Sequence, residues 1–180
     1  MKETARARAV GSGHQGRPRS RGSRLRGVVL LVAVLVLAGV VRLFVVEPFY
    51  VPTPSMAPTL QPGAQAFASR LAYWFGSPHR GDIVVLRSPQ QDDLLLVKRV
   101  VGLPGQRVEV RDGVLIVDRV RQRESYVDYE TVDSTFFGPV TVPPDHVFVM
   151  GDNRANSVDS RIFGAVPESD LLGKVFAHLG

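Results

Sequence analysis

The stretch RVEVRDGVLIV, from Arg107 to Val117, predicts a β-hairpin and decides the fold class. Apolar and polar residues alternate on both sides of Asp112-Gly113, and a period of two residues is typical of a strand with one buried face. An aspartate followed by a glycine suits the positive φ angles of a tight hairpin turn. The segment therefore predicts two antiparallel strands, Arg107–Arg111 and Val114–Arg119.

Further short strands are predicted along the rest of the chain, separated by glycine, proline and aspartate turns with little helical periodicity. The other candidates are Ala64–Ser69, Asp82–Arg87, Leu94–Val101, Val140–Val142, Val147–Met150 and Leu172–Ala177. A chain of 180 residues holds one domain with a core, plus appendages. We expect a mainly β domain of antiparallel sheets over residues 47–180.

Residues 27–46 predict one N-terminal transmembrane helix. The run from Gly27 to Val41 has no charge, and Arg42 is followed by four more apolar residues. About twenty helical residues at ~1.5 Å each span roughly 30 Å, the thickness of a bilayer's hydrocarbon core. Arg42 lies near the end, where its long side chain can reach the headgroups. A signal peptide cleaved after Ala38 is the alternative, but the apolar run continues beyond that position.

The residues before this span form a basic tail. Residues 1–26 contain eight lysines and arginines against one acid, so the net charge of +5 comes from the tail and the remainder is mildly acidic. Its glycine, serine and arginine content predicts disorder. Basic residues ahead of a span favour a cytoplasmic N-terminus. We therefore expect a single-pass protein of the cell membrane whose domain over residues 47–180 is extracytoplasmic. A basic arm also suits nucleic acid, but the span favours a lipid bilayer as the partner and no nucleic acid.

Ser55, in VPTPSMAPTL (Val51–Leu60), is the candidate nucleophile. The surrounding prolines fit either an ordinary turn serine or a hydroxyl held in one orientation. A serine needs a base to remove its proton. None of the four histidines has a recognisable triad context, and there is no G-x-S-x-G elbow; they are His14, His79, His146 and His178. With no cysteine, disulfides, thiolate metal sites and cysteine nucleophiles are excluded.

Lys98, in LLLVKRVVG, is the candidate base, because a buried lysine can lose its charge. On a strand Lys98 shares a face with Leu94, Leu96 and Val100, while Arg99 points to the opposite face, stays charged and reaches solvent. A lysine that extends to solvent from a sheet edge is the alternative reading. The S-x-x-K and K-T-G patterns of penicillin-recognising enzymes are absent.

Four ordered segments surround these residues: EPFYVPTPSMAPTL (47–60), RGDIVVL (80–86), KRVVGLPGQRVEV (98–110) and GDNRANSVDSRIFGAVP (151–167). With the N-terminal span, they resemble the bacterial type I signal peptidases over about residues 40–175. The resemblance implies a signal-peptidase-like catalytic domain and a membrane-anchored serine endopeptidase. Such an enzyme would remove signal peptides from secretory precursors after small-x-small sites, typically Ala-x-Ala, through an acyl-enzyme and without a cofactor.

The resemblance also implies roles for single residues. Ser55 is expected as the nucleophile and Lys98 as the general base. The backbone N–H of Ser55 and the hydroxyl of Thr53 are expected to form the oxyanion hole, and Ser157 to hydrogen-bond and orient the lysine. Asp159 and Arg161 are expected to form a buried ion pair, with Asp152 nearby. The expected walls of the substrate cleft are Phe49, Val51, Met56, Leu60, Leu96 and Val97.

The chain departs from the family pattern at a few positions. Pro54 replaces a Gly of other members, so a more rigid loop is expected. Ala155 replaces an expected Asp and Phe163 an expected Trp at supporting positions, where an effect on local packing is expected more than one on activity. The last motif lacks the glycine that an EF-hand loop needs, so no metal is expected. Two rivals remain: a Ser–Lys self-cleaving repressor-type protease, and a membrane-anchored β module without catalysis. The aromatic cluster at 73–75 fits either the core or a bilayer interface.

Overall fold

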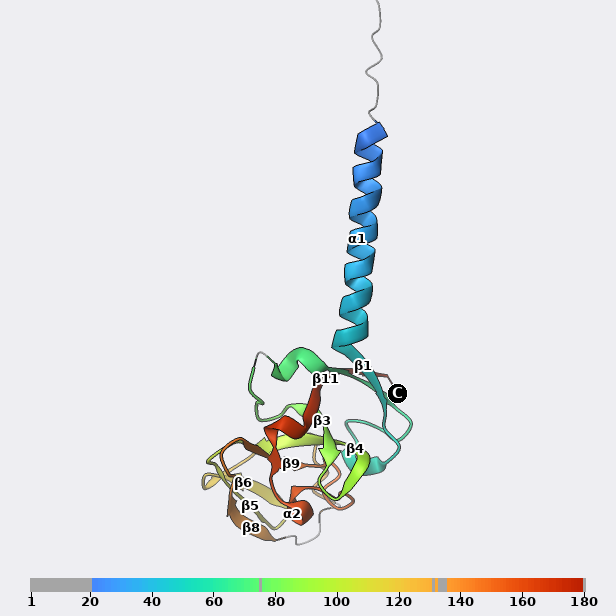
Figure 1. Cartoon of the computed structure of the whole chain (residues 1–180). Helices are drawn as coiled ribbons and strands as arrows, with labels where there is room; N and C mark the ends of the chain where they lie inside the picture. Colours follow the sequence, from blue (N-terminus) through green and yellow to red (C-terminus); the bar gives the residue numbers. More distant parts are fainter. Residues whose placement is uncertain (1–20, 75, 131, 133–135, 180) are drawn as a thin grey trace, which may run out of the picture. The chain divides into compact units, whose positions relative to one another are not determined.

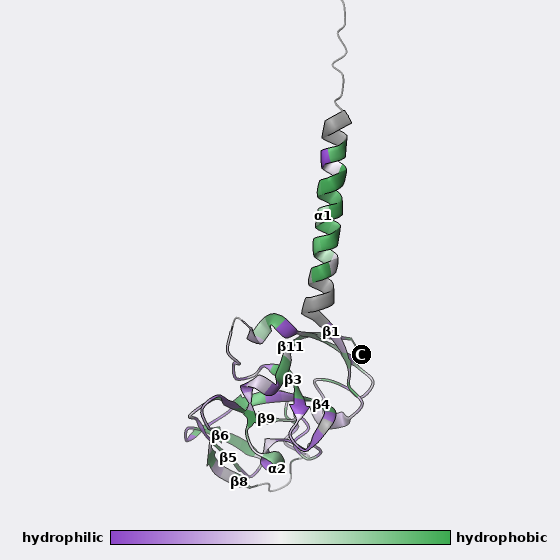
Figure 2. Cartoon of the chain, viewed as in Figure 1, coloured by the Kyte–Doolittle hydropathy of each residue, from purple (hydrophilic) through white to green (hydrophobic). Residues whose placement is uncertain are grey.

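The computed structural model describes residues 21–74, 76–130, 132 and 136–179. The chain divides into two units, residues 1–39 and 40–180, and each is described by itself. Helix α1 covers Arg21–Val45, so residues 21–26 of the predicted disordered tail are helical, and the rest of that tail lies outside the described residues. Figure 2 colours the described middle of α1 as hydrophobic. Within the described residues, no helix has the length and apolar character needed to cross a membrane.

The larger unit contains a seven-stranded antiparallel sheet in the order β1-β2-β11-β3-β4-β9-β10 (Figure 1). Its strands are β1 (Val46–Tyr50), β2 (Gln65–Ser69), β3 (Ile83–Ser88), β4 (Gln91–Gly102), β9 (His146–Met150), β10 (Val166–Pro167) and β11 (Leu171–Leu179). The C-terminal strand β11 pairs with both β2 and β3 and so joins the early strands into one sheet. The long strand β4 lies between β3 and β9, and it carries Lys98.

A second antiparallel sheet has four strands in the order β7-β6-β5-β8. They are β5 (Arg107–Arg111), β6 (Val114–Val117), β7 (Val120–Arg121) and β8 (Phe137–Thr141). The predicted hairpin is confirmed: Arg111 pairs with Val114, and Asp112 and Gly113 have φ angles of 49° and 73°. Positive φ at both turn residues matches the right-handed twist of the two strands.

The mainly β prediction is confirmed, with differences at the ends of the strands. The predicted strand from Val114 ends at Val117, because Asp118 and Arg119 adopt positive φ and turn the chain into β7. The short strands β1, β7 and β10 were not predicted, since two to five residues give little periodic signal. Four single-turn helices were also missed: η1 (Pro54–Met56), η2 (Arg70–Tyr73), α2 (Ser160–Phe163) and η3 (Glu168–Asp170).

Strand β9 separates two of the three apolar clusters of this unit. Phe148 and Met150 pack with the four-stranded sheet, whereas Val147 and Val149 pack with β3 and β4. This division follows from the alternation of side chains along a strand. Figure 1 shows β5, β6 and β8 gathered next to β9. The third cluster consists of Val51, Met56, Leu60 and Ala66.

The aromatic segment after β2 has two different environments. Tyr73 is half-buried and packs against the cluster of β3 and β4, as a core aromatic does. Trp74 is 76% exposed, so it is not a core residue. Phe75 lies outside the described residues.

Candidate active site

Ser55 is held by a short helical turn fixed to the third apolar cluster. Thr53 precedes the turn in extended conformation, and Pro54 occupies its first position, where its fixed φ suits the start of a helix. Met56 and Leu60 are fully buried on either side of the following bend, and the Leu60 amide donates to the Met56 carbonyl. Ser55 itself is 8% exposed. The buried neighbours Met56 and Leu60 therefore fix the turn to the core, and the turn holds the Ser55 hydroxyl in place.

Lys98 faces Ser55 from β4. It pairs with Val84 of β3, and its side chain is buried, with 2% of the residue exposed. Its Nζ lies 2.8 Å from Ser55 Oγ, within hydrogen-bond distance. Burial lowers the pKa of Lys98 from 10.5 to about 8, aided by the charge of Arg161 and opposed by those of Asp159 and Asp152. The sheet-edge alternative for Lys98 is therefore wrong.

Thr53 lies beside the same hydroxyl. Its Oγ1 donates a hydrogen bond to Ser55 Oγ over 3.2 Å. The Thr53 residue is exposed, and it lines the same cavity as Ser55 and Lys98. A donor this close to the serine oxygen can be redirected to a substrate oxygen by rotation of its side chain.

A cavity of about 110 Å³ opens next to these three side chains. Four of the six residues predicted to form cleft walls line it: Phe49, Val51, Leu96 and Val97. The other two, Met56 and Leu60, are fully buried in the third cluster and do not line the cavity, because they hold the serine turn from behind. Other lining residues are Tyr50, Pro52, Val85, Leu94 and Leu95, so the walls are largely apolar.

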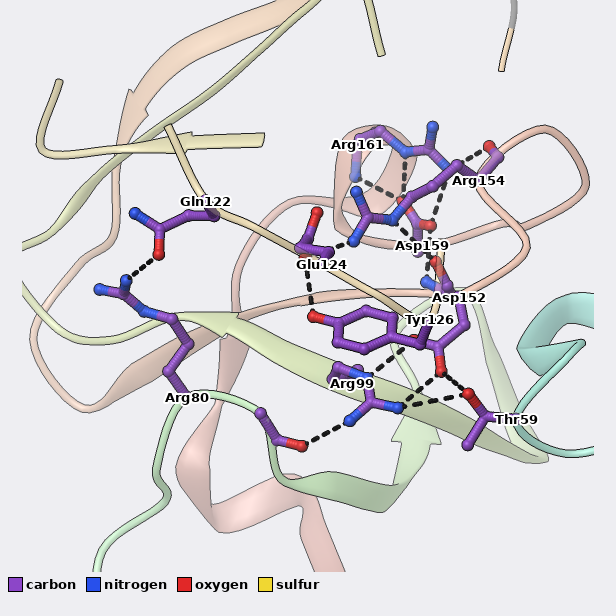
Figure 3. Close-up of polar contacts among 12 residues, drawn as sticks. Thr59, Arg80, Arg99, Gln122, Glu124, Tyr126, Asp152, Arg154, Asp159 and Arg161 are labelled. Atoms are coloured by element: carbon purple, nitrogen blue, oxygen red, sulfur yellow. Dashed lines mark hydrogen bonds and ion pairs between the residues drawn. The ribbon is translucent and has the colours of Figure 1, made fainter. Parts of the chain in front are cut away.

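The prediction that Arg99 reaches solvent is wrong. Its side chain is 11% exposed, and its Nε and Nη2 donate to the two oxygens of Asp152 over 2.8 and 2.7 Å (Figure 3). Thr59 Oγ1 also donates to Asp152, over 2.6 Å. The guanidinium lies 3.8 Å from the centre of the Tyr126 ring. A two-pronged ion pair and an aromatic face thus replace water around Arg99.

The predicted ion pair of Asp159 and Arg161 is present. Asp159 is fully buried, and Arg161 Nε and Nη2 each donate to its carboxylate over 2.9 Å. Asp159 also accepts from the Gly151 amide over 3.0 Å and from the Arg161 amide, which makes it the N-cap of α2. The carboxylate therefore ties α2 to the chain at Gly151, directly behind the serine.

Gly151 permits a close approach of three segments. A Cβ at this position would lie 2.4 Å from the Ser55 carbonyl oxygen and 2.3 Å from Ser157 Oγ. Ser157 Oγ is buried and has no hydrogen-bond partner among the described residues, so the predicted bond from Ser157 to Lys98 is absent from this conformation. The glycine brings Ser157 and the serine turn against one backbone position.

Other buried polar residues near the site were missed by sequence reasoning. Arg154 pairs with Glu124, and both side chains are at most 3% exposed. Ser160 Oγ accepts from the Val149 amide. Arg154 and Ser160 lie inside the fourth motif, residues 151–167. Glu124 and Tyr126, by contrast, follow β7 in a polar stretch with no periodic pattern. Only the folded chain brings them to Arg154 and Arg99.

Comparison with known proteins decides the family. The sequence profile described as "Signal peptidase, peptidase S26" matches residues 24–179. The chain belongs to the signal peptidase family, peptidase S26. It is accordingly a serine peptidase, a hydrolase, and the resemblance drawn from its four motifs is confirmed.

Several members of the signal peptidase family are close relatives. The chain is 40% identical over 155 residues to the "Probable signal peptidase I-1" of Synechocystis sp., covering 81% of this chain and 77% of the relative. It is 35% identical over 168 residues to the signal peptidase I of Leptolyngbya laminosa, covering 87% and 80%. A crystal structure of a signal peptidase I from Enterococcus faecalis V583 matches with a TM-score of 0.50 and 33% identity, covering 56% of this chain and 98% of that one.

The structure shows the surroundings of two residues that depart from the family pattern, Phe163 and Ala155. Phe163, where the resemblance predicts Trp, is half-buried and packs against the cluster of β3 and β4. Ala155, where it predicts Asp, is exposed. Neither position lines the cavity beside the Ser55–Lys98 pair.

Proposed function

We propose that this signal peptidase family member removes signal peptides from secretory precursor proteins, with Ser55 as nucleophile and neutral Lys98 as general base. The observation that carries the proposal is the 2.8 Å distance between Lys98 Nζ and Ser55 Oγ, with the lysine 2% exposed. A buried amine with a pKa near 8 has a neutral fraction that can accept a proton at physiological pH.

The reaction follows the course of other serine acyl transfers. Lys98 Nζ accepts the Ser55 hydroxyl proton as Oγ bonds to the scissile carbonyl carbon. When the tetrahedral intermediate collapses, the C–N bond breaks and the ammonium returns the proton to the leaving amine. Water, deprotonated by the same lysine, then hydrolyses the ester. The Ser55 amide and the Thr53 hydroxyl are the proposed donors to the oxyanion.

Supporting residues keep this pair in place. Asp152, Asp159 and Arg161 are proposed to hold the backbone behind Ser55 and the strand of Lys98, through the ion pairs described above. Ser157 is proposed to orient the lysine. Its buried Oγ has no hydrogen-bond partner among the described residues, which leaves it free to accept from the ammonium that Lys98 becomes during the reaction if the side chains approach each other.

The cavity supports cleavage after small-x-small sites such as Ala-x-Ala. A volume of about 110 Å³ with apolar walls suits small side chains and excludes charged ones. Phe49, Val51, Leu96 and Val97 are the proposed walls. Recognition of two small side chains leaves most of the affinity to main-chain contacts along an extended substrate.

Membrane attachment is a further part of the proposal. The apolar side chains of α1 between Val28 and Val40 are exposed by 45–67%. A continuous apolar surface of this kind requires a nonaqueous environment, which a bilayer around residues 27–46 would supply. The N-terminus would be cytoplasmic and residues 47–180 extracytoplasmic, on the side where exported precursors emerge. The test has two parts. The protein should stay with membranes that are extracted with alkaline carbonate, and protease that reaches only the extracytoplasmic side should digest residues 47–180 and leave the N-terminus intact.

The decisive experiment incubates the full-length protein in detergent with a purified Ala-x-Ala precursor and sequences the new N-terminus of the product. Wild-type protein should cut after the second alanine, and Ser55→Ala and Lys98→Met should not. Ser88→Ala is a matched control, because Ser88 is also 8% exposed and lies outside the site. An uncut precursor with wild-type protein, or cleavage by Ser55→Ala, contradicts the proposed function.

A further inference from the structure

A buried polar network connects the segment after β7 to the catalytic pair. We call it the Glu124 network, and its members are Arg99, Glu124, Tyr126, Asp152 and Arg154 (Figure 3). Glu124 is 3% exposed, and its Oε1 accepts from Arg154 Nη2 over 2.6 Å and from the Tyr126 hydroxyl over 2.8 Å. One carboxylate oxygen thus receives two hydrogen bonds from different parts of the chain.

The first branch of the network leads to Ser55. Arg154 Nε donates to the Gly151 carbonyl over 3.0 Å, and the Asn153 amide donates to the Ser55 carbonyl over 3.1 Å. Gly151 lies directly against that same Ser55 carbonyl. Glu124 therefore fixes Arg154, and Arg154 fixes the backbone on which the serine turn rests.

The second branch leads to Lys98. The hydroxyl of Tyr126 is tied to Glu124, and the ring of Tyr126 lies 3.8 Å from the guanidinium of Arg99. Arg99 follows Lys98 on β4 and is clamped by Asp152 on its other side. A displaced Tyr126 ring would leave Arg99 held only by Asp152 and the Gly81 carbonyl, so the position of Arg99, and with it that of Lys98 beside it on β4, would be less fixed.

The network is poorly suited to a purely stabilising role. Glu124 Oε2 and Arg154 Nη1 are buried without a hydrogen-bond partner among the described residues. Removing such charges from water is costly, and apolar residues of similar volume often give equal or greater stability. A geometric role explains why charged groups occupy these positions.

We propose that Glu124 is a positioning residue that sets the distance between Lys98 Nζ and Ser55 Oγ by holding both of their backbone segments. The inference rests on the proposed function of this pair. No residue of the Glu124 network lines the cavity beside Ser55, so we expect the network to affect the chemical step more than the binding of substrate in that cavity. Its loss should lower kcat and leave KM nearly unchanged.

The test measures kcat and KM of full-length variants on the same precursor, with rates expressed per folded enzyme. Glu124→Ala should lower kcat about 10- to 100-fold, because small displacements of reacting groups have effects of that size. Glu124→Gln keeps an acceptor oxygen for Tyr126 and should recover part of the loss. Glu109→Ala is the matched control, because Glu109 is 7% exposed and paired with Arg111 in the four-stranded sheet. The kcat of this variant should stay at the wild-type value.

A double variant separates positioning from stability. Glu124→Met with Arg154→Met replaces the buried pair by apolar side chains and should recover the thermal stability lost in Glu124→Ala. If Glu124 positions the dyad, kcat of the double variant stays low despite normal folding. A wild-type kcat in the double variant, or in Glu124→Ala, overturns the inference. Failure of the proposed function itself would appear separately, as cleavage by Ser55→Ala or none by wild-type protein.

Discussion

Lys98 and Arg99 are neighbours on β4 but occupy opposite electrostatic environments. Lys98 Nζ lies 2.8 Å from Ser55 Oγ and has no carboxylate partner among the described ion pairs, while Arg99 donates twice to Asp152. Alternation along the strand separates their side chains, so one cation is neutralised by desolvation and the other by an anion. The two neighbours thus differ in role: Lys98 is the proposed base, and Arg99 is held in a structural ion pair.

The pH dependence of cleavage should follow Lys98. Burial lowers its pKa to about 8, and only the neutral amine can accept the serine proton. We expect kcat/KM to rise with pH, about tenfold per pH unit below that pKa, and to level off above it. Steady-state rates from pH 6 to 10 measure this, with circular dichroism as the control for folding. A profile that is flat, or falls, between pH 6 and 8 contradicts a lysine base.

Removing the amine should stabilise the fold at neutral pH. The lowered pKa of Lys98 means that the charged form destabilises the native state, by about 3 kcal/mol at pH 7. The unfolded chain binds the proton more tightly, so this penalty is complete below about pH 8 and disappears as pH approaches 10.5. Lys98→Met should therefore unfold at a higher temperature than wild type at pH 7, with a smaller difference at pH 10. An equal or lower Tm at pH 7 would show that burial does not penalise the lysine.

Thr53 should contribute to catalysis through its hydroxyl. Its Oγ1 lies 3.2 Å from Ser55 Oγ, and Thr53→Val removes the donor at nearly constant shape. Loss of one oxyanion donor typically lowers kcat by ~10²–10³-fold. Thr53→Ser keeps the donor and should stay within about tenfold of wild type, since only a methyl group is lost. Equal rates for the valine and serine variants would exclude Thr53 from the oxyanion hole.

Gly151→Ala should disrupt the site from behind. The added Cβ would lie 2.4 Å from the Ser55 carbonyl oxygen, a backbone atom that cannot rotate away. We expect kcat to fall by at least about 100-fold, because the serine turn must shift. Gly76→Ala is the control, since its Cβ would meet a single atom at 3.4 Å. If both variants cleave at the wild-type rate, Gly151 does not position Ser55.

The sequence alone determined the β class and indicated Ser55 and Lys98 as the proposed chemical pair. The Asp112-Gly113 turn and the alternation around it are local features, and local sequence dictates them through φ preference and strand periodicity. Ser55 in a proline-rich turn and Lys98 in an aliphatic strand stood out as candidates, but the residues alone left an ordinary turn serine and a sheet-edge lysine open. The four surrounding motifs assigned the expected roles through the family resemblance.

The tertiary structure alone decided which charges are buried and what each side chain supports. The burial of Arg99 depends on Asp152, 53 positions further along the chain, and Glu124 meets Arg154 across 30 positions. The core position of Met56 and Leu60 likewise appears only in the folded chain. Such contacts leave no periodic pattern in the chain, because they form only where packing brings distant segments together and excludes water. Desolvation is a property of the assembled fold, and it gives Lys98 its lowered pKa.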